Sequence, residues 1–74
     1  MQLQLNKYYN VPFFQTQDGD FILEEMKLVK ITEYKNEEVF IFEDSLGLTF
    51  ATHTISDDEI NWELVKELNN VFSE

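Results

Sequence analysis

The sequence contains no cysteine, no arginine, one alanine, one proline and two glycines in 74 residues. Without cysteine, the chain can form neither a disulfide framework nor a thiolate metal site, so burial of apolar side chains must hold the fold together. Without arginine, it lacks the planar donor that binds a phosphate or a carboxylate in two places at once. The scarcity of amino acids with GC-rich codons indicates a low-GC genome, bacterial or viral.

Long apolar segments are also missing. The first ten residues, MQLQLNKYYN, lack the basic and apolar regions of a signal peptide, and no apolar run approaches the length of a membrane span. We therefore expect a complete chain that works in the cytoplasm. What the sequence does have is 43% hydrophobic residues, including seven Phe, three Tyr and one Trp. This content favours a single folded domain over a disordered chain.

The net charge is the strongest compositional signal. Fifteen acidic residues against five lysines give a formal charge of −10, which exceeds the roughly 2 to 8 units that keep a small domain soluble. Charge of this size also destabilises the compact state by self-repulsion. Because phosphates and anionic lipids would be repelled, neither nucleic acid nor a membrane is expected as a direct partner. The favoured partner is a cationic surface on another protein.

Alternation of apolar and polar residues predicts strands over about 3–17, 20–34, 38–44 and 48–54. The Asp18-Gly19 pair between the first two strands is typical of a two-residue hairpin loop, which would place Phe14 opposite Leu23. Further turns are expected at 34–38 and 45–47. This succession of strands and short turns predicts an antiparallel four-stranded meander.

The long second strand is expected to bend. Its apolar phase shifts within residues 26–29, which predicts a bulge there, and Pro12 places the first strand at a sheet edge or at a second bulge. A strand bent in this way would wrap around the core, as in SH3-like partial barrels. We expect the core to gather four side chains on one face of the sheet: Val29, Ile31, Phe40 and Phe42.

The C-terminal segment predicts an amphipathic helix over about 57–73 that packs on the sheet. Ser56 and Glu59 have the spacing of a capping box, which would start the helix at Asp57. Apolar residues, among them Leu64 and Leu68, recur at helical spacing. The predicted fold class is therefore α+β, a small and strongly bent four-stranded meander with one C-terminal helix.

The predicted helix carries a run of acids: Asp57, Asp58, Glu59, Glu63 and Glu67. Those in its first turn are favoured by the helix dipole, whereas Glu59, Glu63 and Glu67 would repel one another as i,i+4 neighbours. Five carboxylates over ten steps of about 1.5 Å give one charge per roughly 3–4 Å, close to the spacing of phosphates along one DNA strand. This row would mimic a nucleic-acid backbone, or it is simply a solvated helix face.

Two function classes remain open. In the first, the protein is a non-catalytic inhibitor or adaptor, such as a phage or mobile-element product acting against host defence, that occupies a basic, nucleic-acid-binding surface of another protein. Its predicted binding residues are the helix acids together with the acids at the turns: Glu37, Glu38, Glu43 and Asp44. In the second, a bacterial accessory domain binds a protein through its aromatic-rich sheet, with Tyr8, Tyr9 and Phe13 in contact, and the charge only solubilises it.

Catalytic and metal sites find little support in the sequence. His53 is the only histidine, and we expect it to be a half-buried or exposed structural residue rather than part of a serine triad. The Asp18-Gly19-Asp20 segment resembles the start of a calcium loop but lacks the glycine and the glutamate required at its sixth and twelfth positions. We therefore predict no catalytic residue, no metal and no cofactor, and leave the oligomeric state open.

Overall fold

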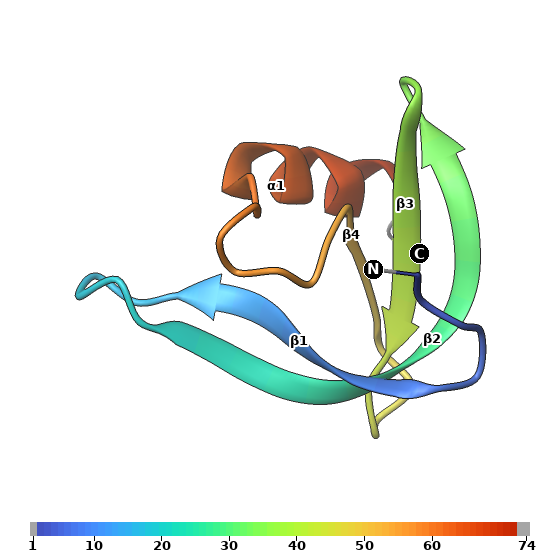
Figure 1. The fold of residues 1–74 in the computed structure, drawn as a ribbon, viewed down its shortest axis with the longest axis horizontal. Coiled ribbons are helices and arrows are strands. Elements are labelled where there is room, and N and C mark those ends of the chain that lie inside the picture. The colour runs from blue at the N-terminus through green and yellow to red at the C-terminus, as the bar shows by residue number, and fades with distance from the viewer. Residues whose placement is uncertain (1, 73–74) are drawn as a thin grey trace.

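The computed structural model describes residues 2–72, which form one open antiparallel sheet and a C-terminal helix (Figure 1). The elements are β1 (Tyr8–Gln15), β2 (Phe21–Tyr34), β3 (Glu37–Glu43), β4 (Thr49–Thr52) and α1 (Trp62–Val71). The strands lie in the order β1-β2-β3-β4, each paired with its neighbour in the sequence. The predicted α+β meander is confirmed. Within the described part of the chain, no helix is long and apolar enough to cross a membrane.

The long strand β2 bends where it passes from one partner to the next. Residues 21–27 pair with β1 and residues 27–34 pair with β3, and the second register shifts at Val29. A bulge bends its strand and increases the local twist, as the curvature of β2 in Figure 1 shows. The predicted bulge is confirmed. Pro12 also lies where predicted, on the edge strand β1 and beside a second shift that precedes Phe14.

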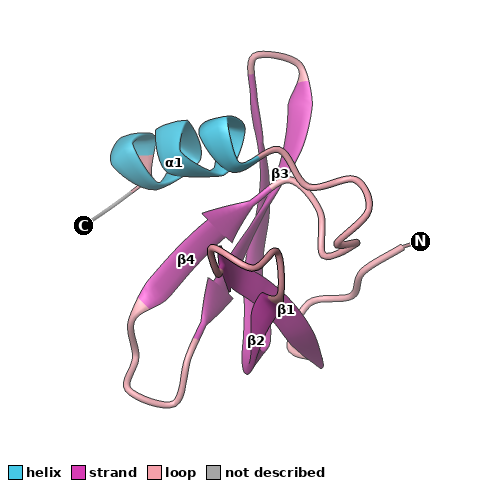
Figure 2. Cartoon of the chain, turned by 90° about the vertical axis from the view of Figure 1, so that its left-hand side faces the viewer, coloured by secondary structure: helices cyan, strands magenta, loops and turns pink. Residues whose placement is uncertain are grey.

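Strand β3 is buried on both faces. Its apolar residues divide between two clusters: Phe40 and Phe42 pack with Leu3, Val11, Met26 and Leu28, whereas Val39 and Ile41 pack with Ala51 and Leu68. The curled β1–β2 hairpin covers the first face, and α1 lies over the second, beside β4 (Figure 2). Burial on both faces explains why β3 reads as a continuous apolar run rather than as an alternating one.

The predicted single-faced core is therefore wrong in part. Phe40 and Phe42 share a face as expected, but Val29 packs with the other cluster because the bulge changes its direction. Ile31 lies opposite Phe40 in the register yet is 38% exposed. The sheet extends beyond its cover at this point, so Ile31 contributes less to the core than its sequence position indicates.

The first hairpin has a three-residue loop, not the predicted two-residue loop. The N–H of Thr16 donates to the Asp20 carbonyl at 2.8 Å, and Gly19 has a φ of +90° while its N–H donates to the Thr16 carbonyl at 3.0 Å. Loops of three residues commonly end with a left-handed residue, which glycine adopts without strain. The extra loop residue changes the register, so Phe14 pairs with Ile22 rather than with the next residue along the strand.

The other two turns fall where the sequence predicts them. The loop between β3 and β4 repeats the form of the first, with Asp44 N–H donating to the Leu48 carbonyl at 2.9 Å and Gly47 at a φ of +83°. The loop between β2 and β3 has two residues, Lys35 and Asn36, with φ of 50° and 66°. Positive φ at both positions is the signature of a type I′ turn.

The helix begins later than predicted. Asn61 is its N-cap, and the Asn61 Oδ1 accepts hydrogen bonds from the backbone N–H groups of Glu63 and Leu64 at 3.1 and 3.2 Å. Asparagine caps a helix about as well as serine does, so local preference does not separate Asn61 from Ser56. The predicted start at Asp57 is wrong. The helix ends at Val71, and the predicted end at 73 lies outside the described residues.

Tertiary contacts hold residues 53–61 out of the helix. Ile55 packs against the first core cluster, and the backbone N–H of Asn61 donates to the Nε2 of His53 at 2.9 Å. The N–H of Glu59 donates to the carbonyl of Ser56 at 3.1 Å, which closes a single turn. These contacts carry the chain from β4 to the start of α1 along a path that a longer helix could not follow.

A side-chain amide joins α1 to the free edge of β4. The Asn69 Oδ1 accepts the N–H of Ala51 at 2.9 Å, and its Nδ2 donates to the carbonyls of Ala51 and Val65, both at 2.8 Å. The amide thus takes the place of a neighbouring strand at Ala51. Edge strands expose unpaired backbone groups that invite aggregation, and the helix covers this edge at its centre.

The central role of β3 leads to a first prediction. Phe42 is fully buried, so replacing it with Ala should lower the free energy of unfolding by about 3–5 kcal/mol because a cavity is left behind. Leu46, which is 81% exposed at the β3–β4 turn, provides the control, and Leu46→Ala should leave urea unfolding nearly unchanged. Equal losses in the two variants would contradict the assigned core.

The position of the cap leads to a second prediction. Asn61→Ala should lower the free energy of unfolding by about 1 kcal/mol through loss of the acceptor for two helix N–H groups. Ser56→Ala should cost clearly less, because the Ser56 side chain caps no helix in this structure. Thermal melts of the two variants separate these starts, and a larger loss for Ser56→Ala would place the helix start at Asp57.

Candidate partner-binding surface

The predicted acids on β3 lie at opposite ends of the strand. Glu37 and Glu38 begin it, and Glu43 ends it, with Asp44 following in the turn. A strand rises about 3.3 Å per residue, so the two groups are separated by roughly 20 Å. The predicted binding set therefore does not form one continuous row.

The predicted acidic row on the helix is also broken. Asp57, Asp58 and Glu59 lie exposed in the turn before α1, and only Glu63 and Glu67 belong to the helix. The expected spacing of one charge per roughly 3–4 Å assumed a helix through all five positions, so the helical form of the nucleic-acid mimic is wrong. The acids remain on the surface, but three of them lie in a turn and two on the helix.

Glu67 helps to hold the fold together. Its Oε2 accepts hydrogen bonds from the Tyr34 hydroxyl at 2.7 Å and from the Lys35 Nζ at 2.9 Å. The pKa of Glu67 is lowered, first by the hydrogen bond from Lys35 and then by the one from Tyr34. The pKa of Lys35 is raised, chiefly by the same hydrogen bond. Since these contacts tie the β2–β3 turn to α1, Glu67 is less suited to meet a partner than the sequence indicates.

Asp44 likewise serves a turn. Its Oδ1 accepts the backbone N–H groups of Leu46 and Leu48, both at 2.9 Å, which shapes the loop between β3 and β4. Glu43 lies beside it and pairs in register with Lys27 on β2. Together with Glu25, these charged residues line a hollow of about 370 Å³. The acids at this end of β3 are thus accompanied by a lysine.

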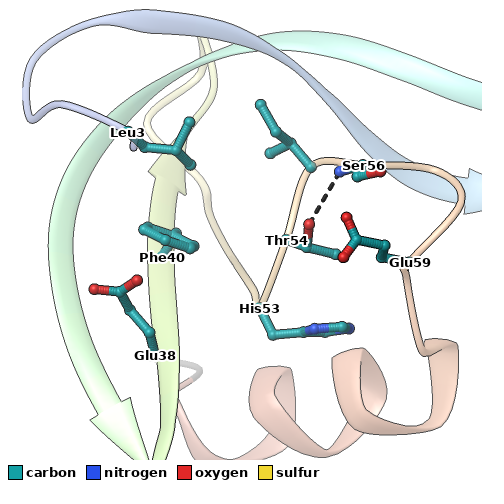
Figure 3. Close-up of a pocket in the computed structure, with 8 residues that line it drawn as sticks. Leu3, Glu38, Phe40, His53, Thr54, Ser56 and Glu59 are labelled. Atoms are coloured by element: carbon teal, nitrogen blue, oxygen red, sulfur yellow. Dashed lines mark hydrogen bonds between the residues drawn. The ribbon is translucent and has the colours of Figure 1, made fainter. Parts of the chain in front are cut away.

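Glu38 and Glu59 are predicted acids from distant parts of the sequence that line a second pocket together. Glu38 comes from β3 on one side and Glu59 from the turn on the other, and the pocket between them measures about 310 Å³ (Figure 3). Its other lining residues combine apolar and polar side chains: Leu3, Phe40, Ile55, His53, Thr54 and Ser56. Three apolar side chains and two carboxylates therefore meet at this pocket, one carboxylate from β3 and one from the turn before α1.

His53 lines this pocket and fastens the chain that leads to α1. It is half-buried, as predicted, and its Nε2 accepts the N–H of Asn61 at 2.9 Å. The ring nitrogen that accepts this bond must be without a proton, which places any proton of the neutral ring on Nδ1. Among residues 2–72, no group of three or more His, Asp and Glu side chains has a geometry suited to a metal ion.

Most carboxylates of residues 2–72 face solvent without a paired cation. Between the described residues one ion pair forms, that of Lys35 with Glu67, although the chain carries fifteen acids. Glu37, Glu38, Glu59 and Glu63 are all exposed. The negative charge is therefore left available at the surface, which is the electrostatic property that a cationic partner would meet.

Sequence reasoning missed an apolar feature of the surface. Phe14 is 56% exposed on the β1–β2 hairpin, and together with Phe13, Gln15 and Trp62 it lines a shallow hollow of about 330 Å³. The expected pairing of Phe14 with Leu23 obscured this arrangement, because it depends on the register and on the true start of α1. The residue in the sequence that could have predicted this hollow is Asn61, because an N-cap at Asn61 makes Trp62 the first helical residue.

Comparison with known proteins provides no functional assignment for this surface. No protein-family model, no curated protein and no solved structure matches the chain. A function has to be inferred from the charges, hollows and contacts described above.

The contacts of Glu67 lead to a prediction about pH. Because the pKa of Glu67 is lowered by folding, its stabilising effect is present above the unfolded-state pKa and is lost as the pH falls through the lowered folded-state value. Glu67→Gln should therefore slightly reduce stability at neutral pH, and the difference from the unmodified protein should shrink in acid. Urea unfolding across this range measures it, with the exposed Asp58→Asn as the matched control. A deficit that stays constant with pH would contradict the ionic role of Glu67.

Proposed function

We propose that this protein is a small non-catalytic binding protein that docks on a basic, nucleic-acid-binding surface of another protein in the cytoplasm and so acts as an inhibitor or adaptor. The observation that carries the proposal is the unbalanced charge: −10 overall, with one ion pair among the described residues. Self-repulsion of this size costs stability. A basic partner would offset that cost on binding and would be attracted over a long range.

The pocket between Glu38 and Glu59 is the part of the surface best suited to this role. A lysine or arginine side chain of the partner would lay its aliphatic stem on the apolar side chains of Leu3, Phe40 and Ile55, with its charge between the two carboxylates. Asp57 and Asp58, which precede Glu59 in the turn, are exposed and would extend the contact. Glu37 precedes Glu38 on β3 and therefore points to the opposite face of the sheet. Glu67 and Asp44, by contrast, are engaged in the fold.

The alternative of binding through the aromatic-rich sheet is less well supported in its original form. The Tyr9 ring packs edge-on against Phe42 with centroids 6.2 Å apart, and its hydroxyl accepts the N–H of Gln4 at 2.9 Å. Phe13 is partly buried against the same cluster. Of the three expected contact residues, Tyr8 alone is largely exposed, at 62%.

The proposal predicts a salt-sensitive complex that DNA can displace. Capture on the immobilised protein from a low-GC bacterial lysate at low salt should retain a nucleic-acid-binding protein. Raising the salt to about 0.5 M should release it, because the Debye length falls to a few ångströms. Added duplex DNA should also release it, since both ligands would occupy the same basic surface.

Two double variants that remove the same amount of negative charge from different places test where the partner binds. The double variant Glu38→Gln with Glu59→Gln should weaken binding to the captured protein at least several-fold. Its control, Glu25→Gln with Glu33→Gln, removes the same charge elsewhere on the surface and should weaken binding less. A complex that survives both high salt and DNA, and responds equally to both double variants, would refute the proposal.

A further inference from the structure

The β1–β2 hairpin exposes apolar side chains that no other part of residues 2–72 covers. Phe14, Ile22 and Leu23 are 56%, 41% and 54% exposed. Phe14 and Ile22 are direct partners in the register and therefore lie on the same face of the hairpin. In Figure 1 the tip of this hairpin extends away from β3 and β4. Exposed apolar groups concentrated in one element mark an interaction site more often than scattered ones do.

The apolar hollow beside Phe14 is held in a fixed shape. Its wall opposite the hairpin is Trp62, the first residue of α1. The Trp62 ring stacks on Phe21 with centroids 6.3 Å apart and planes inclined by 24°, and the N-cap Asn61 fixes the helix end that carries it. A hollow formed in advance loses less conformational entropy on binding than a mobile one.

The hairpin part of this apolar surface carries acidic residues and no lysine, whereas Lys66 follows Trp62 by one turn on α1. Residues 8–26 contain four acids and no lysine. Side chains two residues apart on extended chain point to the same face, so Asp20 and Glu24 lie on either side of Ile22. A ligand that covers Ile22 and Phe14 would therefore meet negative charge on both flanks.

The negative charge of Asp20 and Glu24 favours one candidate ligand of this surface over the others. In a symmetric dimer the same patch would face itself, so Asp20 and Glu24 would be brought close to acids of the second copy. An anionic lipid surface would be repelled for the same reason. A protein segment with cationic flanks gains from this charge, whereas the other occupants lose.

We propose that the apolar hairpin surface, formed by Phe13, Phe14, Ile22 and Trp62, docks a protein segment in which an apolar side chain is flanked by lysine or arginine. The proposal shares the cationic partner of the proposed function, on which it rests in that respect, but adds an apolar anchor at a separate place on the surface. The apolar side chain enters the hollow beside Trp62, and the flanking cations reach Asp20 and Glu24.

Trp62 is the only tryptophan and therefore reports directly on this hollow. The probes are short peptides of lysine and serine without aromatic residues: one with a central leucine, one with serine in its place, and one in which the leucine is kept and the lysines are replaced by serine. At low salt, the first peptide should change Trp62 emission in a saturable way. The other two should bind at least about tenfold more weakly, since each lacks one of the two contributions.

A matched pair of variants tests the location. Phe14→Ser should weaken binding of the leucine peptide about tenfold or more, whereas Leu46→Ser, which alters an even more exposed leucine on the other hairpin, should leave it unchanged. Far-ultraviolet circular dichroism confirms that each variant is folded. Should Phe14→Ser fail to fold, Ile22→Ser and the comparison of peptides on the unmodified protein still decide the matter.

The outcomes separate this proposal from the proposed function. If the serine peptide binds as tightly as the leucine peptide and Phe14→Ser has no effect, the hairpin proposal is overturned while electrostatic binding stands. An absence of any response to the leucine peptide overturns it as well, whatever protein the immobilised chain captures. Dimerisation at about 0.5 M salt that Phe14→Ser abolishes would identify a second copy as the occupant and would also overturn it.

Discussion

Burial of β3 on both faces is the constraint on which the rest of this structure depends. Phe40 and Phe42 need one cover, and Val39 and Ile41 need another on the opposite side. A chain of 74 residues has few residues with which to cover both faces of β3, because small domains bury a modest share of their surface. The bulge in β2 provides the first cover by curling the β1–β2 hairpin over the sheet, and α1 provides the second.

Helix α1, which covers the second face of β3, is held in place by polar side chains as well as by apolar ones. Asn69 takes the place of a neighbouring strand at Ala51, and Glu67 receives hydrogen bonds from Tyr34 and Lys35. At the other end of the helix, Asn61 caps the first turn while its own N–H is accepted by His53. These bonds satisfy backbone and side-chain groups that would otherwise be left unpaired at a sheet edge and a helix end. They also fix the path that carries Glu59 toward Glu38.

The distribution of charge depends on which acids form structural hydrogen bonds. A few acids are engaged in the fold, and most of the other described acids are exposed, with one ion pair between the described residues. An acidic surface of this kind attracts a basic partner from a distance, whereas an apolar hollow contributes affinity only after contact. The pocket between Glu38 and Glu59 and the apolar hairpin surface beside Trp62 would therefore serve different stages of one association.

Local patterns in the sequence by themselves determined the strand order, the bulge in β2, the edge position of Pro12 and the amphipathic character of the last helix. Each of these follows from side-chain periodicity or from one residue with a strong backbone preference. The loop of the first hairpin, the start of α1 and the grouping of the acids were decided only by tertiary structure. Two- and three-residue loops are both compatible with Asp18-Gly19, and Ser56 and Asn61 are comparable caps, so local free energies nearly balance. Packing of Ile55 in the core, the stacking of Phe21 on Trp62 and the bond from Asn61 to His53 connect residues distant in the sequence, and such contacts favour one alternative only once the whole chain is folded.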